Sequence, residues 1–194
     1  MKVIDILKQS AELLGLTDIA KQLSEAQPEN ENNLLENEEI FSLLNLIRFS
    51  IQELCTNYLP VATSETITTH NKTFEINHLA NFIRIQNVLK GEQSVDYKVI
   101  NRCIHFEEDG EYVVQYATYP EIESMFEELD YMCSLSPDVI VFGLSAYYAL
   151  SKGLFDEFQI YHNQYIEKAE SIKTLKMFNI PQRRWEWELN KELK

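Results

Sequence analysis

Apolar positions in the first sixty residues recur at helical spacing. One stripe ends before Gly15 and a longer one ends before Pro60, and both return every three or four positions, as on one face of an α-helix. The polar stretch QPENENN separates them, and either Asn33 or Asn37 can cap the long helix. We therefore expect N-terminal helices here. The stripes consist of Val3, Ile4, Leu7, Ala11 and Leu14, and of Ile40, Leu44, Ile47, Ile51, Leu54 and Tyr58.

The pattern changes between Thr63 and Thr118, where short runs alternate apolar and polar side chains. Alternation with a period of two is typical of strands, and several such runs separated by turn residues predict an antiparallel meander or a small sandwich. Asp109 and Gly110 form a favoured hairpin turn, so we expect the runs RCIHFE and YVVQYATY to pair with each other.

The last third of the chain returns to helical patterns. Residues Val139 to Ser151 carry no charge and are apolar on every side, and Ser136 and Pro137 favour a helix start just before them. This run is too short to cross a bilayer, which takes about 20 residues. Gly153 ends the helix, and an amphipathic helix follows. A helix that is apolar all the way round indicates a central core helix, a helix covered by a neighbouring subunit, or both.

These patterns together predict an α+β fold. We expect a helical body formed by residues 1–60 and 121–177, a small antiparallel β region over residues 61–120, and an extended C-terminal tail over residues 178–194. The helical body combines the N-terminal helices with a C-terminal helix–Gly–helix unit.

Composition and charge narrow the classes of function. The chain of 194 residues is 45% hydrophobic and 25% charged, which is typical of folded, soluble proteins. A net charge of −14 argues against wrapping duplex DNA, because phosphate binding requires clustered Lys and Arg. No signal peptide is visible. Three widely separated cysteines without ligand spacing indicate reduced thiols in a cytosol, so we expect no metal site and no cofactor.

Catalytic signals are weak throughout the sequence. The chain contains no nucleophile-elbow, phosphate-loop, dinucleotide-binding or zinc-protease motif. Cys103 and His105 would share one face of a strand, but no third orienting group can be identified. The stronger interpretation is that Cys103 and His105 are ordinary side chains of a half-buried sheet without a catalytic role. We therefore expect a protein that is not an enzyme.

An acidic run without any basic residue leads out of the β region. It lacks the pattern of a calcium-binding loop, which leaves two interpretations. The run is either a solvated loop, or a surface that repels DNA and lines a channel through which DNA slides. The channel-lining candidates are Glu121, Glu123, Glu127, Glu128 and Asp130.

Small and aromatic side chains on the last two helices are candidates for contacts between subunits. Small residues let helices approach closely, and aromatic residues anchor interfaces. The alternative is that the same side chains pack inside one chain. The interface candidates are Gly143, Ala146, Tyr147, Tyr148, Phe155, Phe158 and Tyr161.

The C-terminal tail is the most unusual segment. Its sequence RRWEWEL alternates large apolar and acidic side chains, as in an extended strand that can add to the sheet edge of a partner. Arginine and tryptophan are also the residues that dominate interface hot spots. We expect a docking arm, and a disordered end is the alternative. The candidate residues of this arm are Arg183, Arg184, Trp185, Trp187 and Leu189.

Three stretches together resemble the head–tail connector proteins (adaptor or neck proteins) of tailed bacteriophages and prophages. They are LLNLIRFSIQELCTNYLP, GEYVVQYATYPE and VIVFGLSAYYALSKGLFDEFQIYHNQYIEKAES, and the resemblance covers residues 35–175. Phe158 stands where a small residue is frequent in that family, and Ile160 and Tyr161 stand where an aromatic residue is frequent.

The resemblance implies a structural virion protein without catalysis or a bound cofactor. Such proteins form a ring, typically of twelve copies, beneath the portal at the capsid vertex, and this ring extends the DNA channel. The implied partners are further copies of the chain, the portal protein, and the next neck or tail protein. DNA passes without tight binding, no membrane is involved, and the protein is made in the cytoplasm of the bacterial host. On this interpretation the tail docks on the portal.

Two other classes of protein stay open from the residues alone. An acidic DNA mimic or regulatory binding protein would be monomeric or dimeric, and would bind a DNA-binding protein through its carboxylates. A small thiol-dependent hydrolase would use Cys103 and His105, and would need a pocket around Cys103.

Overall fold

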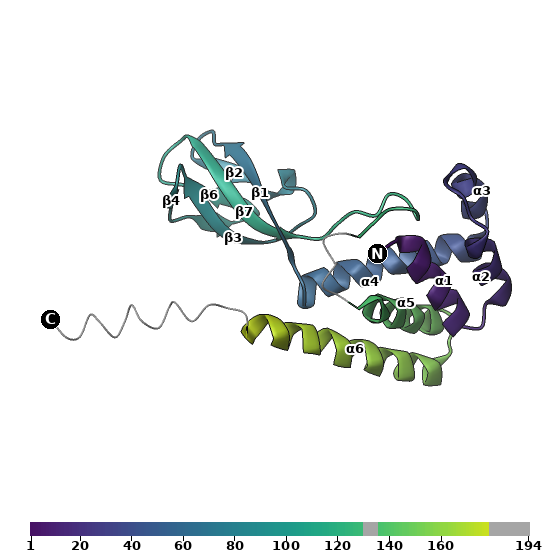
Figure 1. Ribbon diagram of the computed structural model, residues 1–194. Helices are drawn as coiled ribbons and strands as arrows, with labels where there is room; N and C mark the ends of the chain where they lie inside the picture. Colours follow the sequence, from purple (N-terminus) through teal and green to yellow (C-terminus); the bar gives the residue numbers. More distant parts are fainter. Residues whose placement is uncertain (130–135, 179–194) are drawn as a thin grey trace.

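Helices and strands occupy opposite ends of the molecule. The computed structural model describes residues 1–129 and 136–178, with side chains up to residue 172. Figure 1 shows a group of helices at one end and a β region at the other, joined by the end of helix α4 and by the segment that follows β7. The α+β fold class expected from the sequence is confirmed for these residues.

The helices begin and end close to the positions that the sequence indicates. Gly15 and Gly153 follow helices with φ of +71° and +74°, a conformation that glycine adopts without steric cost. Asn37, not Asn33, caps the long helix, because its side chain accepts a hydrogen bond of 3.0 Å from the backbone N–H of Glu39. The helices are α1 (Val3–Leu13), α2 (Thr17–Ser24), α3 (Glu31–Leu35), α4 (Glu38–Asn57), α5 (Pro137–Ser151) and α6 (Phe155–Phe178), with a 3-10 turn at Pro28–Asn30.

One hydrophobic core joins the two ends of the chain. Helices α1, α4 and α6 all pack against α5. The buried cluster combines Leu7 and Ile47 from the N-terminal helices with Leu144 from α5 and Tyr165 from α6. Residues distant in sequence therefore depend on each other for burial, and the helical body is a single packing unit.

The β region consists of two small antiparallel sheets. One sheet has the strand order β1-β7-β3-β4 and the other β2-β6-β5. Both contribute to a second hydrophobic cluster, which includes Ile67, Val88 and Val114 from the first sheet and Ile104 from the second. The strands are β1 (Val61–Thr68), β2 (Thr73–Glu75), β3 (Phe82–Lys90), β4 (Gln93–Ser94), β5 (Lys98–Ile100), β6 (Cys103–His105) and β7 (Glu111–Thr118).

The hairpin predicted at Asp109 and Gly110 is wrong. Strand β6 pairs with β2 and β5, whereas β7 pairs with β1 and β3. Gly110 lacks the positive φ that a tight two-residue hairpin turn requires. The Asp109 carboxylate instead accepts a hydrogen bond of 2.6 Å from the backbone N–H of Lys72. The segment therefore carries the chain from one sheet to the other.

The segment after β7 returns the chain to the helical body. Ile122, Met125 and Leu129 are buried in the helical core. Near its end the segment makes two backbone hydrogen bonds with the N-terminus, from Val3 N–H to the Glu127 carbonyl (3.0 Å) and from Leu129 N–H to the carbonyl of Met1 (2.8 Å). Within residues 1–129 and 136–178, no helix has both the length and the apolar character of a membrane span.

Candidate functional site

Helix α5 lies at the centre of the helical body. Its buried residues point in every direction around the helix, because α1, α4 and α6 surround it. Gly143 lets two of these neighbours approach: a Cβ atom added there would lie 3.1 Å from Cδ2 of Tyr165 and 3.5 Å from Cβ of Ser50. The small residues of α5 thus serve packing within one chain.

This packing changes the set of candidate subunit contacts. Gly143 and Ala146 are buried inside the subunit, and Tyr148 is 6% exposed, so these three residues offer little or no surface to a neighbouring subunit in this conformation. Other helices of the same chain cover most of the surface of α5, which explains why this helix carries no charge. The candidates that remain accessible are Tyr147, Phe158 and Tyr161, which are half-buried, and Phe155, which is 65% exposed.

Two tyrosines of α5 bind carboxylates of α4. Tyr147 donates a hydrogen bond to Glu53, and Tyr148 donates one to Glu39, whose carboxylate also lies 3.2 Å from Nζ of Lys152. Burial, followed by the hydrogen bond to the carboxylate, raises the pKa of each tyrosine above its ordinary value. The Tyr148 hydroxyl, supported by Lys152, lowers the pKa of Glu39 despite its partial burial. These polar pairs fix the position of α5 on α4.

Large apolar side chains stay exposed beside these pairs. We call five of them the apolar rim: Phe41 and Phe49 on α4, Leu150 at the end of α5, Leu154 in the turn and Phe155 at the start of α6. Their exposed fractions lie between 42% and 65%. The ring of Phe49 packs edge-on against Tyr147, with 4.8 Å between the ring centroids.

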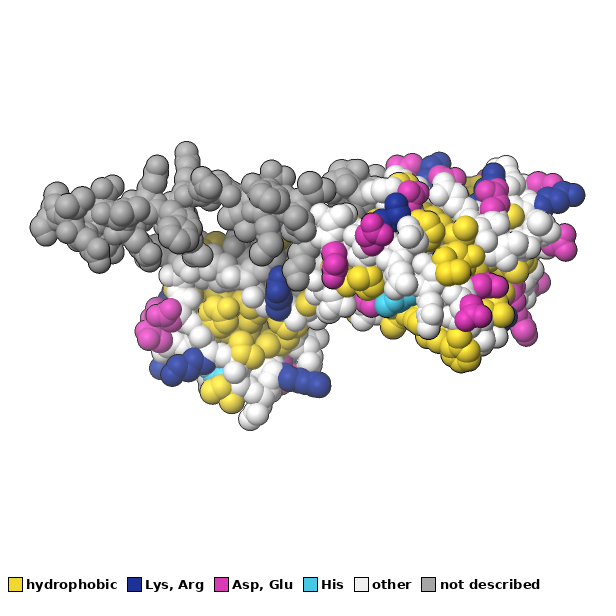
Figure 2. Space-filling view, turned by 90° about the horizontal axis from the view of Figure 1, so that it is seen from below, with side chains coloured by type: hydrophobic (Ala, Val, Ile, Leu, Met, Phe, Trp, Pro, Cys, Tyr) yellow, Lys and Arg dark blue, Asp and Glu magenta, His cyan; other side chains and the backbone are white. Residues whose placement is uncertain are grey.

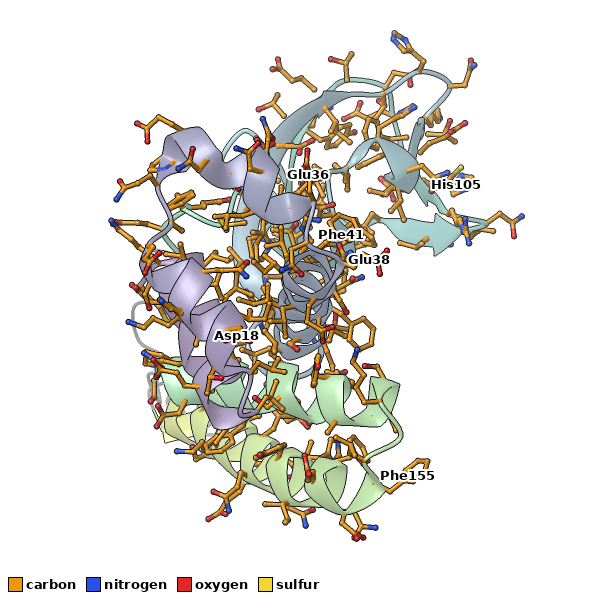
Figure 3. The ribbon with its side chains drawn as sticks, turned by 90° about the vertical axis from the view of Figure 1, so that its right-hand side faces the viewer. Asp18, Glu36, Glu38, Phe41, His105 and Phe155 are labelled. Carbon is orange, nitrogen blue, oxygen red and sulfur yellow. The ribbon has the colours of Figure 1, made fainter. Side chains whose placement is uncertain are left out.

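The apolar rim is bordered by acidic residues. Figure 3 shows Phe155 pointing away from the helices at the α5–α6 turn, and Phe41 with Glu38 beside it near the start of α4. Asp156 and Glu157 follow Phe155 directly and are exposed. Exposed apolar surface of this kind commonly marks a site of protein contact.

The acidic segment is anchored at both ends but keeps carboxylates in solvent. The Arg48 guanidinium donates a hydrogen bond of 2.9 Å to the carbonyl of Ile122, and Glu31 accepts hydrogen bonds from Ser124 Oγ (2.8 Å) and from Met125 N–H (2.7 Å). Of the channel-lining candidates, Glu121, Glu123 and Glu128 are exposed, and Glu127 is half-buried. Asp130 lies outside the described residues, as do Arg183, Arg184, Trp185, Trp187 and Leu189 of the predicted arm.

Cys103 and His105 are the two side chains that a thiol enzyme would use. Cys103 and His105 both lie on β6 and are half-buried. A cavity beside His105 is lined by Asp96, Tyr97, Lys98, His105, Phe106 and Glu107, and Cys103 is not among these residues. In the part of the chain that the structure describes, no three His, Cys, Asp or Glu side chains are grouped so as to hold a metal ion.

Two features of the site were missed from the sequence. The tyrosine–carboxylate pairs join residues about 90 to 110 positions apart, and no local signal connects such positions. The rim residues Phe41 and Phe49 carried a signal, since both fall outside the apolar stripe of their helix. Large aromatic residues off the stripe of an amphipathic helix have no core to enter and are candidates for external contacts.

Comparison of the sequence with protein-family models and with curated proteins finds no match.

Proposed function

We propose that the chain is a structural subunit of a ring at the junction of head and tail in a tailed bacteriophage or prophage. The ring lies beneath the portal and extends the channel through which DNA passes. It contains many copies of the chain, twelve in the proteins that the sequence resembles. The portal and the next neck or tail protein are its partners, and its place is the virion.

The apolar rim is the observation that carries this proposal. An isolated subunit exposes Phe155 at 65% and Phe49 at 51%, although large apolar side chains are costly to leave in water. In a closed ring each subunit presents one surface to the neighbour on one side and a different surface to the neighbour on the other. Contact with the next subunit would remove the rim from water.

The acidic surface supports a role beside DNA rather than on it. On the face shown in Figure 2, acidic side chains are frequent over the helical part. Glu121, Glu123 and Glu128 are exposed on the segment that follows the β region. Carboxylates facing a channel would repel the phosphates and keep DNA from adhering.

The arrangement of carboxylates is less favourable for a DNA mimic. Such a protein needs free carboxylates at the spacing of phosphates. Here Glu39, Glu53 and Glu65 bind tyrosine hydroxyls, and Glu31 holds the segment after β7. These four side chains are engaged within the fold and are not free to imitate phosphates.

Quantitative mass spectrometry of purified phage particles tests the proposal. We expect as many copies of the chain as of the portal protein, within the accuracy of the method. One or two copies per particle, or recovery of the chain only with a DNA-binding protein, would contradict it.

A charge placed in the apolar rim provides a second test. Phe155→Glu should reduce incorporation into particles without unfolding the subunit, because the side chain is exposed. Gln164→Glu is the matched control, since it adds the same charge at an exposed position on the opposite side of the same helix. Equal incorporation of the two variants would remove the rim from the ring contact.

A further inference from the structure

Strand β1 has an open edge. It pairs with β7 over its full length, in unbroken register from Val61 opposite Thr118 to Thr68 opposite Glu111. Among residues 1–129 and 136–178, no strand lies on its other side, and β1 is the outermost strand of its sheet. Within the described residues, no backbone hydrogen bond beyond the ladder with β7 uses β1. The N–H and C=O groups that point outward along this edge therefore have no backbone partner in the described part of the chain.

The other sheet edges carry features that hinder pairing with a further strand. Strand β3 has two register irregularities and an exposed arginine, Arg84, at its free part. Strand β4 has only two residues, and β2 and β5 have three each, with an exposed Lys98 at the start of β5. Short length, bulges and basic side chains are the usual means by which proteins keep an edge from pairing.

Strand β1 lacks all of these features. Its eight residues, VATSETIT, include no proline and no basic side chain. Its one charged residue, Glu65, accepts a hydrogen bond from the hydroxyl of the buried Tyr116. The exposed side chains on the strand, Ala62, Ser64, Thr66 and Thr68, are short and leave the edge accessible. An edge of this length and character is suited to accept another strand.

We propose that β1 accepts an extended strand from a second copy of the chain, and that residues 183–189 of that copy supply it. This segment, RRWEWEL, alternates large apolar and acidic side chains with the period of a strand. Added to β1, it places Trp185, Trp187 and Leu189 together on one face of the sheet. The inference rests on the proposed ring and names a neighbouring subunit, in place of the portal, as the acceptor of the predicted arm.

The length of the chain beyond α6 permits such an exchange. Figure 1 places the C-terminal end of α6 toward the same end of the molecule as the β region. The seven residues that follow Phe178, up to and including Trp185, span at most about 25 Å when extended. Each subunit then has one donor arm and one acceptor edge, and a contact of this kind continues from subunit to subunit around a ring.

Tryptophan fluorescence of the full-length protein tests the proposal. The chain contains two tryptophans, and both belong to the donor segment. As the protein concentration rises and copies associate, we expect the emission to shift to shorter wavelength and quenching by acrylamide to decrease. Hydrogen exchange should slow over Val61–Thr68 in the same concentration range.

A lysine placed on β1 should distinguish docking of the arm on this strand from association of copies through another surface. In Thr66→Lys the long basic side chain stands at the acceptor edge beside the arginines of the arm, so the fluorescence shift should be lost. Gln93→Lys is the matched control: it adds the same charge at an exposed position on the opposite edge of the same sheet, and should behave as the unmodified chain.

Each outcome decides the proposal. Tryptophans that stay accessible at every concentration would overturn it, and so would an equal effect of the two lysines. Shielded tryptophans in a chain that sedimentation shows to be monomeric would mean that the arm docks on its own subunit, and would also overturn it. A ring at the head–tail junction whose tryptophans contact the portal would refute this inference while leaving the connector function intact.

Discussion

The helical body and the β region obtain their cores in different ways. The helical core brings together residues of α1 and α4 with residues of α5 and α6, which are more than 80 positions later in the chain. The β region takes its buried cluster from residues 67–116 alone. The helical body therefore needs both ends of the chain to form, whereas the β region between them has its own core.

A charge at the centre of the helical body should have the largest effect. Ala146 is fully buried on α5, so Ala146→Glu places an unpaired carboxylate in the core and should destabilise the subunit by roughly 4 kcal/mol or more. Leu150→Glu, one turn further along at an exposed position, is the control and should cost less than about 1 kcal/mol. Urea unfolding measures both, and equal stabilities would contradict the central position of α5.

Truncations in the two cores should separate the two regions. Leu44→Ala in the helical core and Ile104→Ala in the β core should each cost about 2–5 kcal/mol locally, because both side chains are buried. Hydrogen exchange should accelerate in α1, α4, α5 and α6 for the first variant, and in the strands for the second. Acceleration throughout the molecule in both variants would show one cooperative unit instead of two.

Replacing a glycine by alanine should destabilise the helical body more than the β region. Gly143→Ala brings a Cβ atom to 3.1 Å from the Tyr165 ring, which is closer than ordinary contact. Because Tyr165 is fully buried and has little room to move, we expect this contact to outweigh the roughly 1 kcal/mol that alanine gains inside a helix, with a net cost of about 0.5–2 kcal/mol. In Gly110→Ala the nearest atoms belong to the flexible Lys90 side chain at 3.5 Å, and the effect should stay within about 0.5 kcal/mol. Thermal unfolding compares the two, and a larger loss for Gly110→Ala would be inconsistent with the close packing of α5.

Removal of one hydroxyl should have a smaller effect. Tyr147→Phe keeps the aromatic contact with Phe49 but deletes the hydrogen bond to Glu53, at a cost of about 0.5–1.5 kcal/mol. Tyr97→Phe in the β region is the control, since its hydroxyl makes no hydrogen bond with any described residue. Chemical denaturation of both variants gives the comparison, and equal values would indicate that the Tyr147–Glu53 pair does not stabilise α5 on α4.

The dependence of stability on pH should show the smallest effect. The hydroxyl of Tyr148, with Lys152, lowers the pKa of Glu39 in the folded state. The resulting stabilisation is present above the unfolded-state pKa of about 4.3 and is lost as the pH falls through the folded-state value. Glu39→Gln should therefore reduce the loss of stability in acid, and Glu38→Gln, at the exposed neighbouring position, should reduce it less. The same acid dependence in both variants would exclude this role of Glu39.

The helices could be predicted from the sequence because their signals are local. The stripe from Ile40 to Tyr58 repeats at helical spacing, and Asn37, Gly15 and Gly153 mark boundaries by short-range effects. The sequence could not predict which helices surround α5. An apolar pattern shows that a helix is buried, but not which elements pack against it.

For the strands, the positions could be predicted but the pairing could not. Their positions follow from alternation, but their partners depend on residues far away in the sequence. β1 pairs with β7 some fifty residues later, and the local turn signal at Asp109 and Gly110 indicated the wrong partner for β7. The exposure of the candidate contact residues could not be predicted either. Tertiary packing leaves Phe155 exposed and buries Ala146, and the helical patterns of the sequence do not specify this packing.

A cryo-EM map of the assembled particle at the head–tail junction is the decisive measurement for the proposed function. We predict a closed ring of this chain between the portal and the next neck protein, with Phe49, Leu154 and Phe155 of each subunit covered by its neighbour. A map in which the chain is absent from the junction, or is present with these three side chains open to solvent, would contradict the proposal.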